Sequence, residues 1–395
     1  MHDLSTDVVT VSAKAENGST FAAAGYDENR VRTMSNADVV RRLSRIIQQK
    51  VQVYYPDRDS RSARVVGKAW GGEGSARTFR FEIRSKSLPK KNTIYVKLYP
   101  IYERFNPALL EYETLHLLYY RMPLIERTCQ VSRPLDFYPE LNAYAMESAG
   151  NSIFKQYLLK NNSRLRRDES LSELFSIVAG CATWLKTFHE ITRSGTTKKF
   201  DYPAYMASIN EDCDYRALKN QRFKRETIRA LGAVFGKLRR CHDQYDLPCA
   251  KSHWDFTPAH VFVDEDRIRV IDVLGGENIP IYEDLGRFLA AMSTVNNLPF
   301  YPLFDHQRAE TTLCDRFLEA YARGRGLEPE QFMLFTHIYK LKHLILWFCG
   351  QRLQVSSRIH PIAGTLFADL RLVGLFERSL MRTINEISQR MDGLD

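Results

Sequence analysis

The sequence predicts a two-part α+β protein, in which a small β-rich unit precedes a larger, mostly helical one. Two observations carry this prediction. Short β-branched and aromatic runs, separated by Gly and Pro clusters, fill residues 51–99 and are typical of an antiparallel meander. From Ile153 onward the pattern is mostly helical, apart from two strand-like runs within residues 252–274. This order indicates two units joined by a short hinge-like segment near residue 147.

The first element is expected after an N-terminal tail. Residues 1–35 are rich in Ser, Thr, Ala, Gly and Asn, and we expect a mobile tail there. Capping residues at 35–38 and the helical spacing of VVRRLSRII then predict a short amphipathic helix. We interpret its arginines as a solvated face, and the alternative is a membrane-surface or partner contact.

Strands are expected next from four runs: VQVYY at 51–55, ARVVGKAW at 63–70, TFRFEIR at 78–84 and TIYVKLY at 93–99. A helix follows over 107–121, and two short strands are expected around 131–137 and 143–146. These elements predict a first unit over residues 36–147 with a five-stranded sheet. The second unit, residues 148–395, contains the hairpin 252–274 and four or five C-terminal amphipathic helices.

Composition indicates a globular protein, because 44% of the 395 residues are apolar and 26% are charged. The net charge of +9 is compatible with nucleic acid, anionic lipid or phosphorylated ligands and selects none of them. No apolar run approaches the roughly 18 residues of a membrane span, although peripheral membrane contact stays open. The N-terminus lacks the pattern of a secretory signal and the seven cysteines are widely spaced. We therefore expect a cytoplasmic protein with reduced thiols.

Two carboxylates flank the predicted hairpin. Asp255 lies in SHWDFTPAHVFVD, and Asp272 follows in VIDV. Phosphoryl transfer uses such a pair, in which one carboxylate orients the attacking hydroxyl and the other holds a metal ion. The alternative is an ordinary hairpin with acidic ends.

One lysine stands inside an apolar strand. Lys97 in TIYVKL would be costly to bury unless its ammonium group is paired. Glu111, at the start of the next predicted helix, is the candidate partner, and Glu113 is the fallback. A strand lysine held by a helix glutamate positions ATP phosphates in kinase folds. The alternative is an outward-facing lysine and a capping glutamate.

A Gly-rich segment, GKAWGGEGS at 67–75, lies between two strand-like runs. The backbone N–H groups of such a turn can approach a phosphate closely, which makes Gly72, Gly74 and Ser75 candidate phosphate contacts. The segment matches neither G-x-G-x-x-G nor G-x-x-x-x-G-K-[ST], and a plain hairpin loop is the alternative.

Taken in order, these residues resemble the aminoglycoside phosphotransferase and choline kinase group, which are small-molecule kinases with a protein kinase-like fold. The catalytic loop of that family, H-G-D-x-x-x-x-N, stands here as residues 253–260, and its V-I-D-[FW] metal segment stands as residues 270–273. The later D-L-[AG] element is matched by Asp284-Leu285-Gly286. The resemblance covers roughly residues 60–295 and implies a bilobal fold with a β N-lobe and a helical C-lobe.

The resemblance also implies roles and cofactors. ATP and Mg²⁺ or Mn²⁺ would be bound, with Lys97 on the phosphates, Glu111 pairing with it and Asp272 on the metal. Asp255 would be the catalytic base. Adenine would lie against backbone groups of the hinge, at Met146, Glu147 and Ser148.

Two positions depart from the family pattern. Trp254 replaces the loop glycine, and His260 replaces the asparagine that is the second metal ligand. Imidazole is a poorer ligand for Mg²⁺ than a carbonyl oxygen, so His260 puts the second metal position and full activity in question. His189 and His253 are interpreted as structural hydrogen-bonding groups.

The acceptor is inferred from charge. Residues 331–360 include Lys340, Lys342, Arg352 and Arg358 with aromatic residues Tyr339, Trp347 and Phe348, and they include no Asp or Glu. If this segment lines the acceptor side, a neutral or anionic hydroxyl compound such as a sugar or glycan intermediate is favoured. The alternative is a solvated basic helix face with a buried aromatic stripe. Nucleic acid is not favoured, because no stripe alternates basic and aromatic residues.

The sequence therefore predicts an ATP-dependent phosphotransferase acting on a hydroxyl of a small molecule. The competing hypothesis is a kinase-fold pseudoenzyme that binds nucleotide or a partner without turnover. A protein kinase is disfavoured, because Asp272 and Asp284 are too close in sequence for an activation loop and no A-P-E element follows.

Overall fold

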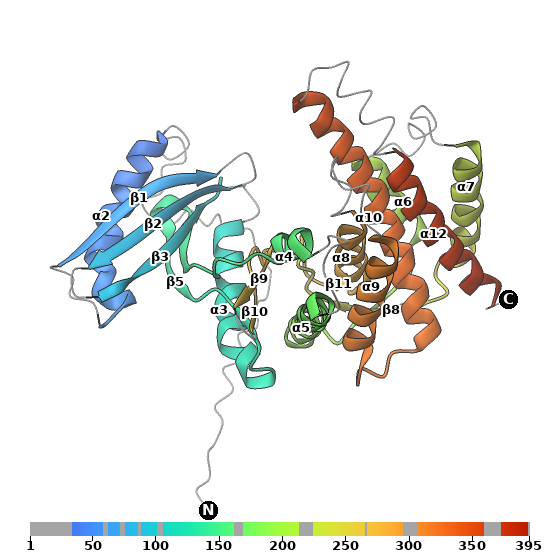
Figure 1. The fold of residues 1–395 in the computed structure, drawn as a ribbon, viewed down its shortest axis with the longest axis horizontal. Helices are drawn as coiled ribbons and strands as arrows, with labels where there is room; N and C mark the ends of the chain where they lie inside the picture. The colour runs from blue at the N-terminus through green and yellow to red at the C-terminus, as the bar shows by residue number, and fades with distance from the viewer. Residues whose placement is uncertain are drawn as a thin grey trace, which may run out of the picture.

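The computed structural model describes residues 34–57, 62–71, 76–85, 88–100, 106–161, 169–212, 224–264, 267–294, 306–358 and 373–393. It has a smaller lobe built on a five-stranded sheet and a larger helical lobe, with α3, β9 and β10 between them (Figure 1). The predicted α+β class is confirmed. The predicted tail, apart from Met34 and Ser35, lies outside the described residues.

Helix α2 (Asn36–Tyr54) is longer than predicted. It begins where the Ser35 side chain accepts a hydrogen bond from the Asp38 amide, and it buries Val39, Leu43, Ile47, Val51 and Tyr54. The strand predicted from VQVYY is wrong, since these residues form and follow the last turn of α2. Val51 and Tyr54 continue the buried helical stripe, and this packing overrides their β propensity.

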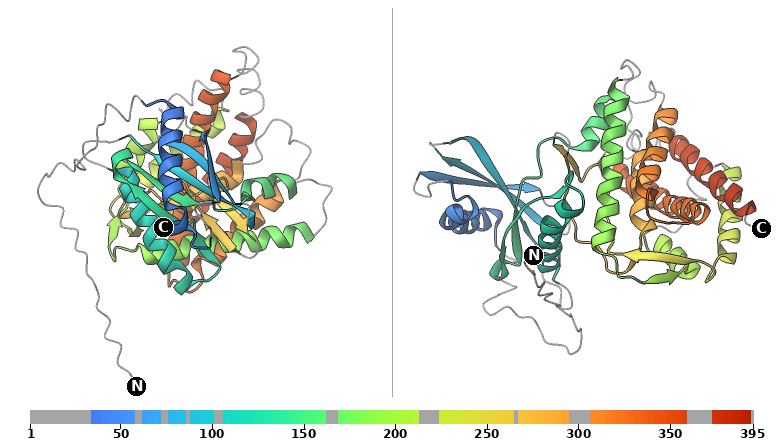
Figure 2. Two further views of the ribbon diagram at one scale, coloured as in Figure 1. Left: turned by 90° about the vertical axis from the view of Figure 1, so that its left-hand side faces the viewer. Right: turned by 90° about the horizontal axis from the view of Figure 1, so that it is seen from below.

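The sheet of the small lobe is antiparallel throughout, in the order β1-β2-β3-β6-β5. Its strands are β1 (Ala63–Gly71), β2 (Arg77–Ser85), β3 (Leu88–Leu98), β5 (Pro134–Tyr138) and β6 (Ala143–Glu147), with the short 3-10 helix η1 (Pro139–Leu141) before β6. A five-stranded sheet was predicted, and its strands correspond to the predicted runs other than VQVYY, with β5 at the run expected around 131–137. Alternate residues of β2, such as Phe79, Phe81 and Ile83, are fully buried. Helix α2 covers that face of the sheet (Figure 2).

Helix α3 (Pro107–Ile125) connects the lobes. Asn106 caps its first turn, and its buried face carries Glu111, Leu115, Leu118 and Met122. The chain then forms β4 (Cys129–Val131), which pairs in parallel with β10 (Arg267–Val270) of the large lobe. This pairing fixes α3 relative to the hairpin that carries the predicted carboxylates.

The large lobe contains α4 (Phe154–Asn161), α5 (Glu169–Ile191), α6 (Tyr202–Asp212), α7 (Arg225–Arg240), α8 (Tyr282–Thr294), α9 (His306–Ala322), α10 (Pro329–Arg358) and α12 (Val373–Asp392). Its short strands are β7 (Thr197–Lys199), β8 (Asp246–Ala250), β9 (Val261–Asp264), β10 and β11 (Ile279–Pro280). Trp184 of α5 stacks between Phe188 and Phe256, at ring-centroid distances of 5.4 and 5.6 Å. This aromatic stack lies beneath the catalytic-loop segment and supports it.

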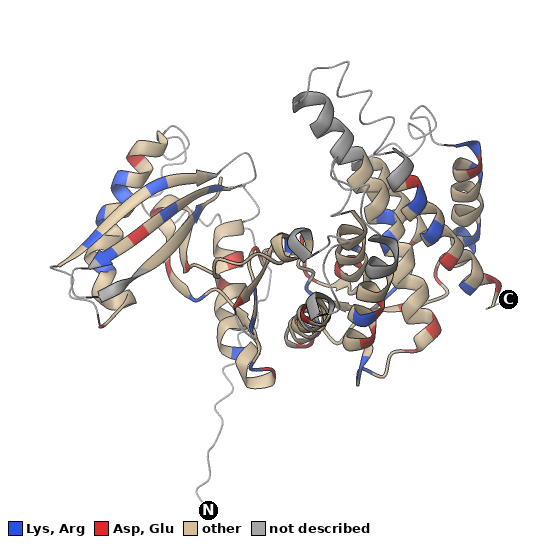
Figure 3. Ribbon diagram, in the orientation of Figure 1, with Lys and Arg blue, Asp and Glu red and all other residues tan. Residues whose placement is uncertain are grey.

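Basic and acidic side chains occur on both lobes, with basic ones prominent on α2, β1 and β2 (Figure 3). Five cysteines, Cys129, Cys181, Cys241, Cys249 and Cys314, are buried and free. No helix in the described ranges is long and apolar enough to cross a membrane.

Candidate active site

Lys97 stands at the centre of the site. Its side chain is 9% exposed, and its Nζ lies 3.0 Å from Glu111 Oε1 and 2.5 Å from Asp272 Oδ1. Burial alone would lower the pKa of Lys97, but the Glu111 and Asp272 carboxylates outweigh it and hold the pKa well above its usual value. The ammonium group is therefore charged at neutral pH. Residues far apart in sequence thus meet where the two lobes join.

Glu111 is fixed from both sides. Its Oε1 accepts from Lys97, and its Oε2 accepts from the Tyr99 hydroxyl at 2.5 Å. The side chain is fully buried, whereas the fallback partner Glu113 lies on the exposed face of α3. The structure therefore brings Glu111, and not Glu113, to Lys97.

The loop that carries Asp255 is held by Asp284 at the start of α8. The Asp284 carboxylate accepts from the backbone amides of His253 and Trp254, at 2.7 and 3.1 Å, and from the Ser252 hydroxyl at 2.9 Å. Burial would raise the pKa of Asp284, but the hydrogen bonds that it accepts from the His189 side chain and the His253 backbone hold the pKa below its usual value. A charged, buried carboxylate thus fixes the backbone conformation of the loop.

Trp254 has φ = 64°, in the left-handed region that favours glycine. This explains the family preference for glycine here. The indole is half exposed and covers Gly276, where an added Cβ would lie 3.0 Å from the ring. The substitution thus adds packing at the mouth of the loop.

His253 lies in the aromatic core beneath the loop. Its Nε2–H donates to the Ile271 carbonyl at 2.9 Å, and its ring packs edge-on against Trp184 and Phe256. Burial lowers the pKa of His253 to about 4, so the ring is neutral at physiological pH. His189 is also buried, with its ring nitrogens 2.7 Å from the Tyr321 hydroxyl and 3.1 Å from Asp284 Oδ2. The contacts of both rings are those of structural groups.

Asp255 and Asp272 converge through His260. The Nδ1–H of His260 donates to the Asp255 carbonyl at 2.8 Å and lies 3.3 Å from Asp255 Oδ2. In the tautomer fixed by that bond, the Nε2 lone pair faces Asp272 Oδ2 at 3.7 Å. Burial would raise the pKa of Asp272, but the Lys97 ammonium group holds it below its usual value. Two electron-pair donors therefore face each other across a gap that suits a cation.

These two groups fit a divalent metal that also binds phosphate oxygens and water. No cluster of three or more His, Cys, Asp or Glu side chains that could hold a metal occurs within the described ranges. A metal at Asp272 and His260 would therefore take its remaining ligands from nucleotide and solvent, as Mg²⁺ commonly does in kinases.

Sequence analysis missed two residues at the site. Arg287 of α8 places Nη1 2.7 Å from Asp255 Oδ1. Lys251, just before the loop, donates to the Thr114 hydroxyl of α3 at 2.7 Å and to Glu277 at 2.8 Å. The position of Arg287 one helical turn after Asp284 is the signal that could have identified it, because residues three apart share a helix face.

Two backbone amides of the hinge already donate hydrogen bonds within the protein. The Glu147 amide donates to the Arg133 carbonyl at 2.9 Å on one side, and the Ser148 amide donates to the Thr93 carbonyl at 3.0 Å on the other. Met146 is buried in β6. Adenine at this hinge would therefore need groups other than these two amides. Gly72, Gly74 and Ser75 lie outside the described residues.

The basic segment 331–360 falls in α10, and its described lysines are not solvated. Lys340 and Lys342 are only 6% and 8% exposed. Lys342 pairs with Glu283 of α8, and His343 Nε2 lies 2.9 Å from the same carboxylate. Tyr339 and Phe348 are buried, whereas Trp347 is half-buried. The prediction of a solvated basic face is therefore wrong for Lys340 and Lys342, whereas the predicted burial of the aromatic stripe is confirmed for Tyr339 and Phe348. The side chains of Arg352 and Arg358 lie outside the described residues.

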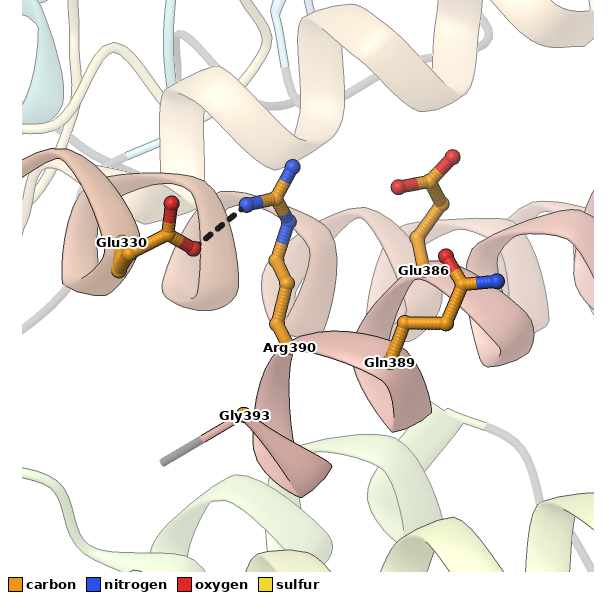
Figure 4. Close-up of a pocket in the computed structure, with 5 residues that line it drawn as sticks. All are labelled: Glu330, Glu386, Gln389, Arg390 and Gly393. Atoms are coloured by element: carbon orange, nitrogen blue, oxygen red, sulfur yellow. Dashed lines mark hydrogen bonds and ion pairs between the residues drawn. The ribbon is translucent and has the colours of Figure 1, made fainter. Parts of the chain in front are cut away.

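A pocket of about 320 Å³ lies apart from this site, where the start of α10 meets the end of α12. In it, Arg390 is already paired with Glu330 at 2.9 Å, whereas Glu386 points away from that pair (Figure 4). The pocket offers none of the groups that the sequence assigned to catalysis.

No protein-family model and no curated protein matches this sequence. Among solved structures, it is similar to a glucosamine kinase in complex with glucosamine, ADP and inorganic phosphate, at 15% identity and a TM-score of 0.51, covering 80% of this chain and 83% of that one. A second crystal form of glucosamine kinase gives 15% identity and a TM-score of 0.50, covering 83% of both chains. A choline/ethanolamine kinase family protein from Mesorhizobium loti is 14% identical, with a TM-score of 0.49, covering 88% of this chain and 99% of that one. The chain therefore has a bilobal, protein kinase-like α+β fold, similar to that of glucosamine kinase.

Proposed function

We propose that the protein is an ATP-dependent kinase that transfers a phosphoryl group to a hydroxyl of a small molecule, of the sugar or glycan-intermediate class. The observation that carries the proposal is the contact of one buried ammonium group, Lys97, with both Glu111 and Asp272. One carboxylate would be enough to neutralise the buried ammonium group. The second carboxylate, Asp272, places a candidate metal ligand beside Lys97, so that phosphate and metal can be held next to each other.

Catalysis would rest on positioning and electrostatic stabilisation. Lys97, oriented by Glu111, binds phosphate oxygens of the nucleotide. Asp272 and His260 would hold a divalent metal, which would supply positive charge beside the phosphate oxygens. Asp255 orients the acceptor hydroxyl and accepts its proton. Arg287, which contacts Asp255 Oδ1, fixes the direction of that carboxylate.

The imidazole ligand bears on the choice of metal. A carboxylate oxygen and a neutral imidazole nitrogen suit Mn²⁺ better than an all-oxygen set does, since Mg²⁺ prefers oxygen. We therefore propose that this protein binds and uses Mn²⁺ at least as well as Mg²⁺.

Two observations support a sugar-like acceptor. A cationic acceptor would meet the guanidinium of Arg287 beside the Asp255 carboxylate, so a neutral or anionic hydroxyl compound is favoured. The glucosamine kinase of similar fold is named for an amino sugar, which supports a sugar-like acceptor but not a particular charge. We retain the division into residues 36–147 and 148–395, and a cytoplasmic location, as parts of the proposal.

The competing function is a pseudoenzyme that binds nucleotide without turnover, and His260 is the residue that favours it. ATP consumption, screened against a panel of hydroxylated metabolites with either Mg²⁺ or Mn²⁺, separates the two. An active kinase consumes ATP with at least one acceptor, and Asp255→Asn removes that turnover but not nucleotide binding. Nucleotide binding without turnover in any arm would favour the pseudoenzyme. Absence of nucleotide binding would contradict both the kinase and the pseudoenzyme.

A further inference from the structure

A basic pocket lies where α3, β4, β10 and the hinge meet. It has a volume of about 440 Å³, and its lining includes Ser132, Arg133, Glu147, Arg267 and Arg269. Pockets of this size are typical of small-molecule sites. Three guanidinium groups and one carboxylate give these five residues a net charge of +2.

The pocket is separate from the proposed nucleotide site. It shares only Glu147 and Ser148 with the residues assigned to nucleotide and metal. It lies on the Arg133 side of the hinge, whereas the Ser148 amide bonds on the opposite side to Thr93 of β3, the strand that carries Lys97. A ligand here would therefore contact the back of the hinge and not the cleft between the lobes.

Two residues that line this pocket each carry a buried polar atom, Ser132 Oγ and Arg133 Nε, with no hydrogen-bond partner among the described residues. Ser132 is only 2% exposed, so water reaches its hydroxyl poorly. Leaving such a buried group without a partner is destabilising. Both groups can donate, and a guanidinium N–H cannot accept, so the missing partner is an acceptor.

The Nη2 group of Arg133 is already used. Its Nη2 donates to the Tyr54 carbonyl at 2.6 Å and contacts Glu147 Oε1 at 3.0 Å. Arg269 is likewise held, by Gln130 at 3.2 Å and Asp264 at 3.2 Å. The fold thus fixes two guanidinium groups in place, and Nε of Arg133 remains as a preorganised donor. Arg267 lies on the exposed side of β10 and adds positive charge at the rim.

We infer that this pocket is a second binding site, which takes a small oxyanion, a phosphate or a carboxylate, carried on a ring. The Ser132 hydroxyl and the Arg133 Nε–H would donate to the anion. Tyr119 and Tyr120, which also line the pocket and whose rings meet edge-on at 5.2 Å, would contact the ring.

The test uses phenyl phosphate and benzoate as probes, with phenol as the neutral control, and isothermal titration calorimetry on the full chain. We expect one or both anions to bind at millimolar concentration or tighter and phenol not to bind. Ser132→Ala should weaken binding about tenfold, as for loss of a hydrogen bond to a charged group. Arg267→Gln should weaken binding and reduce its salt dependence, whereas Arg64→Gln, an equal charge change on exposed β1, should not.

Lys97→Met separates this inference from the proposed function, because Lys97 is the cation that would bind an anion in the cleft. Anion binding that survives Lys97→Met but falls in Ser132→Ala lies in the pocket, whether or not the protein is a kinase. Binding that Lys97→Met abolishes lies in the cleft and overturns the inference. Failure of both anions to bind, or binding that Ser132→Ala and Arg267→Gln leave unchanged, overturns it as well.

Discussion

The buried His253 predicts how stability changes with pH. Its pKa is lowered by burial to about 4, against 6.5 in an unfolded chain. The unfolded state therefore binds a proton that the folded state excludes between these two values. Stability from this group is fully present above pH 6.5 and is lost as pH falls toward 4. A shift of about 2.5 pH units corresponds to roughly 3.4 kcal/mol at the low end of the window.

Urea denaturation of wild type and His253→Gln isolates this contribution. Glutamine can still donate to the Ile271 carbonyl, but it does not titrate. Between about pH 7.5 and 5.0, wild type should lose about 2 kcal/mol more unfolding free energy than the variant. Other buried histidines, such as His189 and His343, also have lowered pKa values, but they are common to both proteins and cancel in the difference. Equal pH slopes for the two proteins would refute the assignment of His253 as a buried neutral ring.

Three further predictions concern single residues. Glu111→Gln should lower the unfolding free energy, measured in urea, by about 2–3 kcal/mol. This is less than the full cost of breaking a buried ion pair, because Asp272 still contacts Lys97. The control Glu113→Gln, at an exposed position, should change the unfolding free energy by less than about 0.5 kcal/mol. Gly275→Ala should destabilise or unfold the protein, because Gly275 has φ = 38° and an added Cβ would lie 1.4 Å from the Ser252 carbonyl oxygen. The control Gly232→Ala, on α7 with open space around it, should stabilise the protein by up to about 1 kcal/mol in thermal melts. His260→Asn should lower the ratio of Mn²⁺- to Mg²⁺-supported turnover, and an unchanged ratio in an active enzyme would mean that His260 is not a ligand.

The fold could be predicted because its signals are local. Period-two burial in β2 and β3 and helical spacing in α3 are visible in the sequence, as is the change between them. The VQVYY segment failed because its composition favours a strand while its spacing continues a helix. Only the packing of Val51 and Tyr54 in the core beneath the sheet decides between the two.

The site was predictable where one residue implies a partner. A lysine in an apolar strand requires a counter-charge, and the structure supplies Glu111 for it. Arg287 and Lys251 lie on segments whose contacts with Asp255 and Thr114 exist only once the lobes have folded. The burial of Lys342 in α10 was missed for the same reason, since its partner Glu283 lies on α8, about sixty residues earlier.

The central claim is that Lys97, Asp255 and Asp272 form a phosphotransfer centre. The most direct measurement is phosphoryl transfer from ATP, followed by ³¹P NMR with the hydroxylated acceptor found in the screen, in wild type, Asp255→Asn and Asp272→Ala. We expect a phosphomonoester product from wild type, at least a hundredfold slower formation by Asp255→Asn with nucleotide binding retained, and loss of metal-dependent nucleotide binding in Asp272→Ala. Wild-type rates in Asp255→Asn, or metal-dependent ATP binding that survives Asp272→Ala, would contradict the claim.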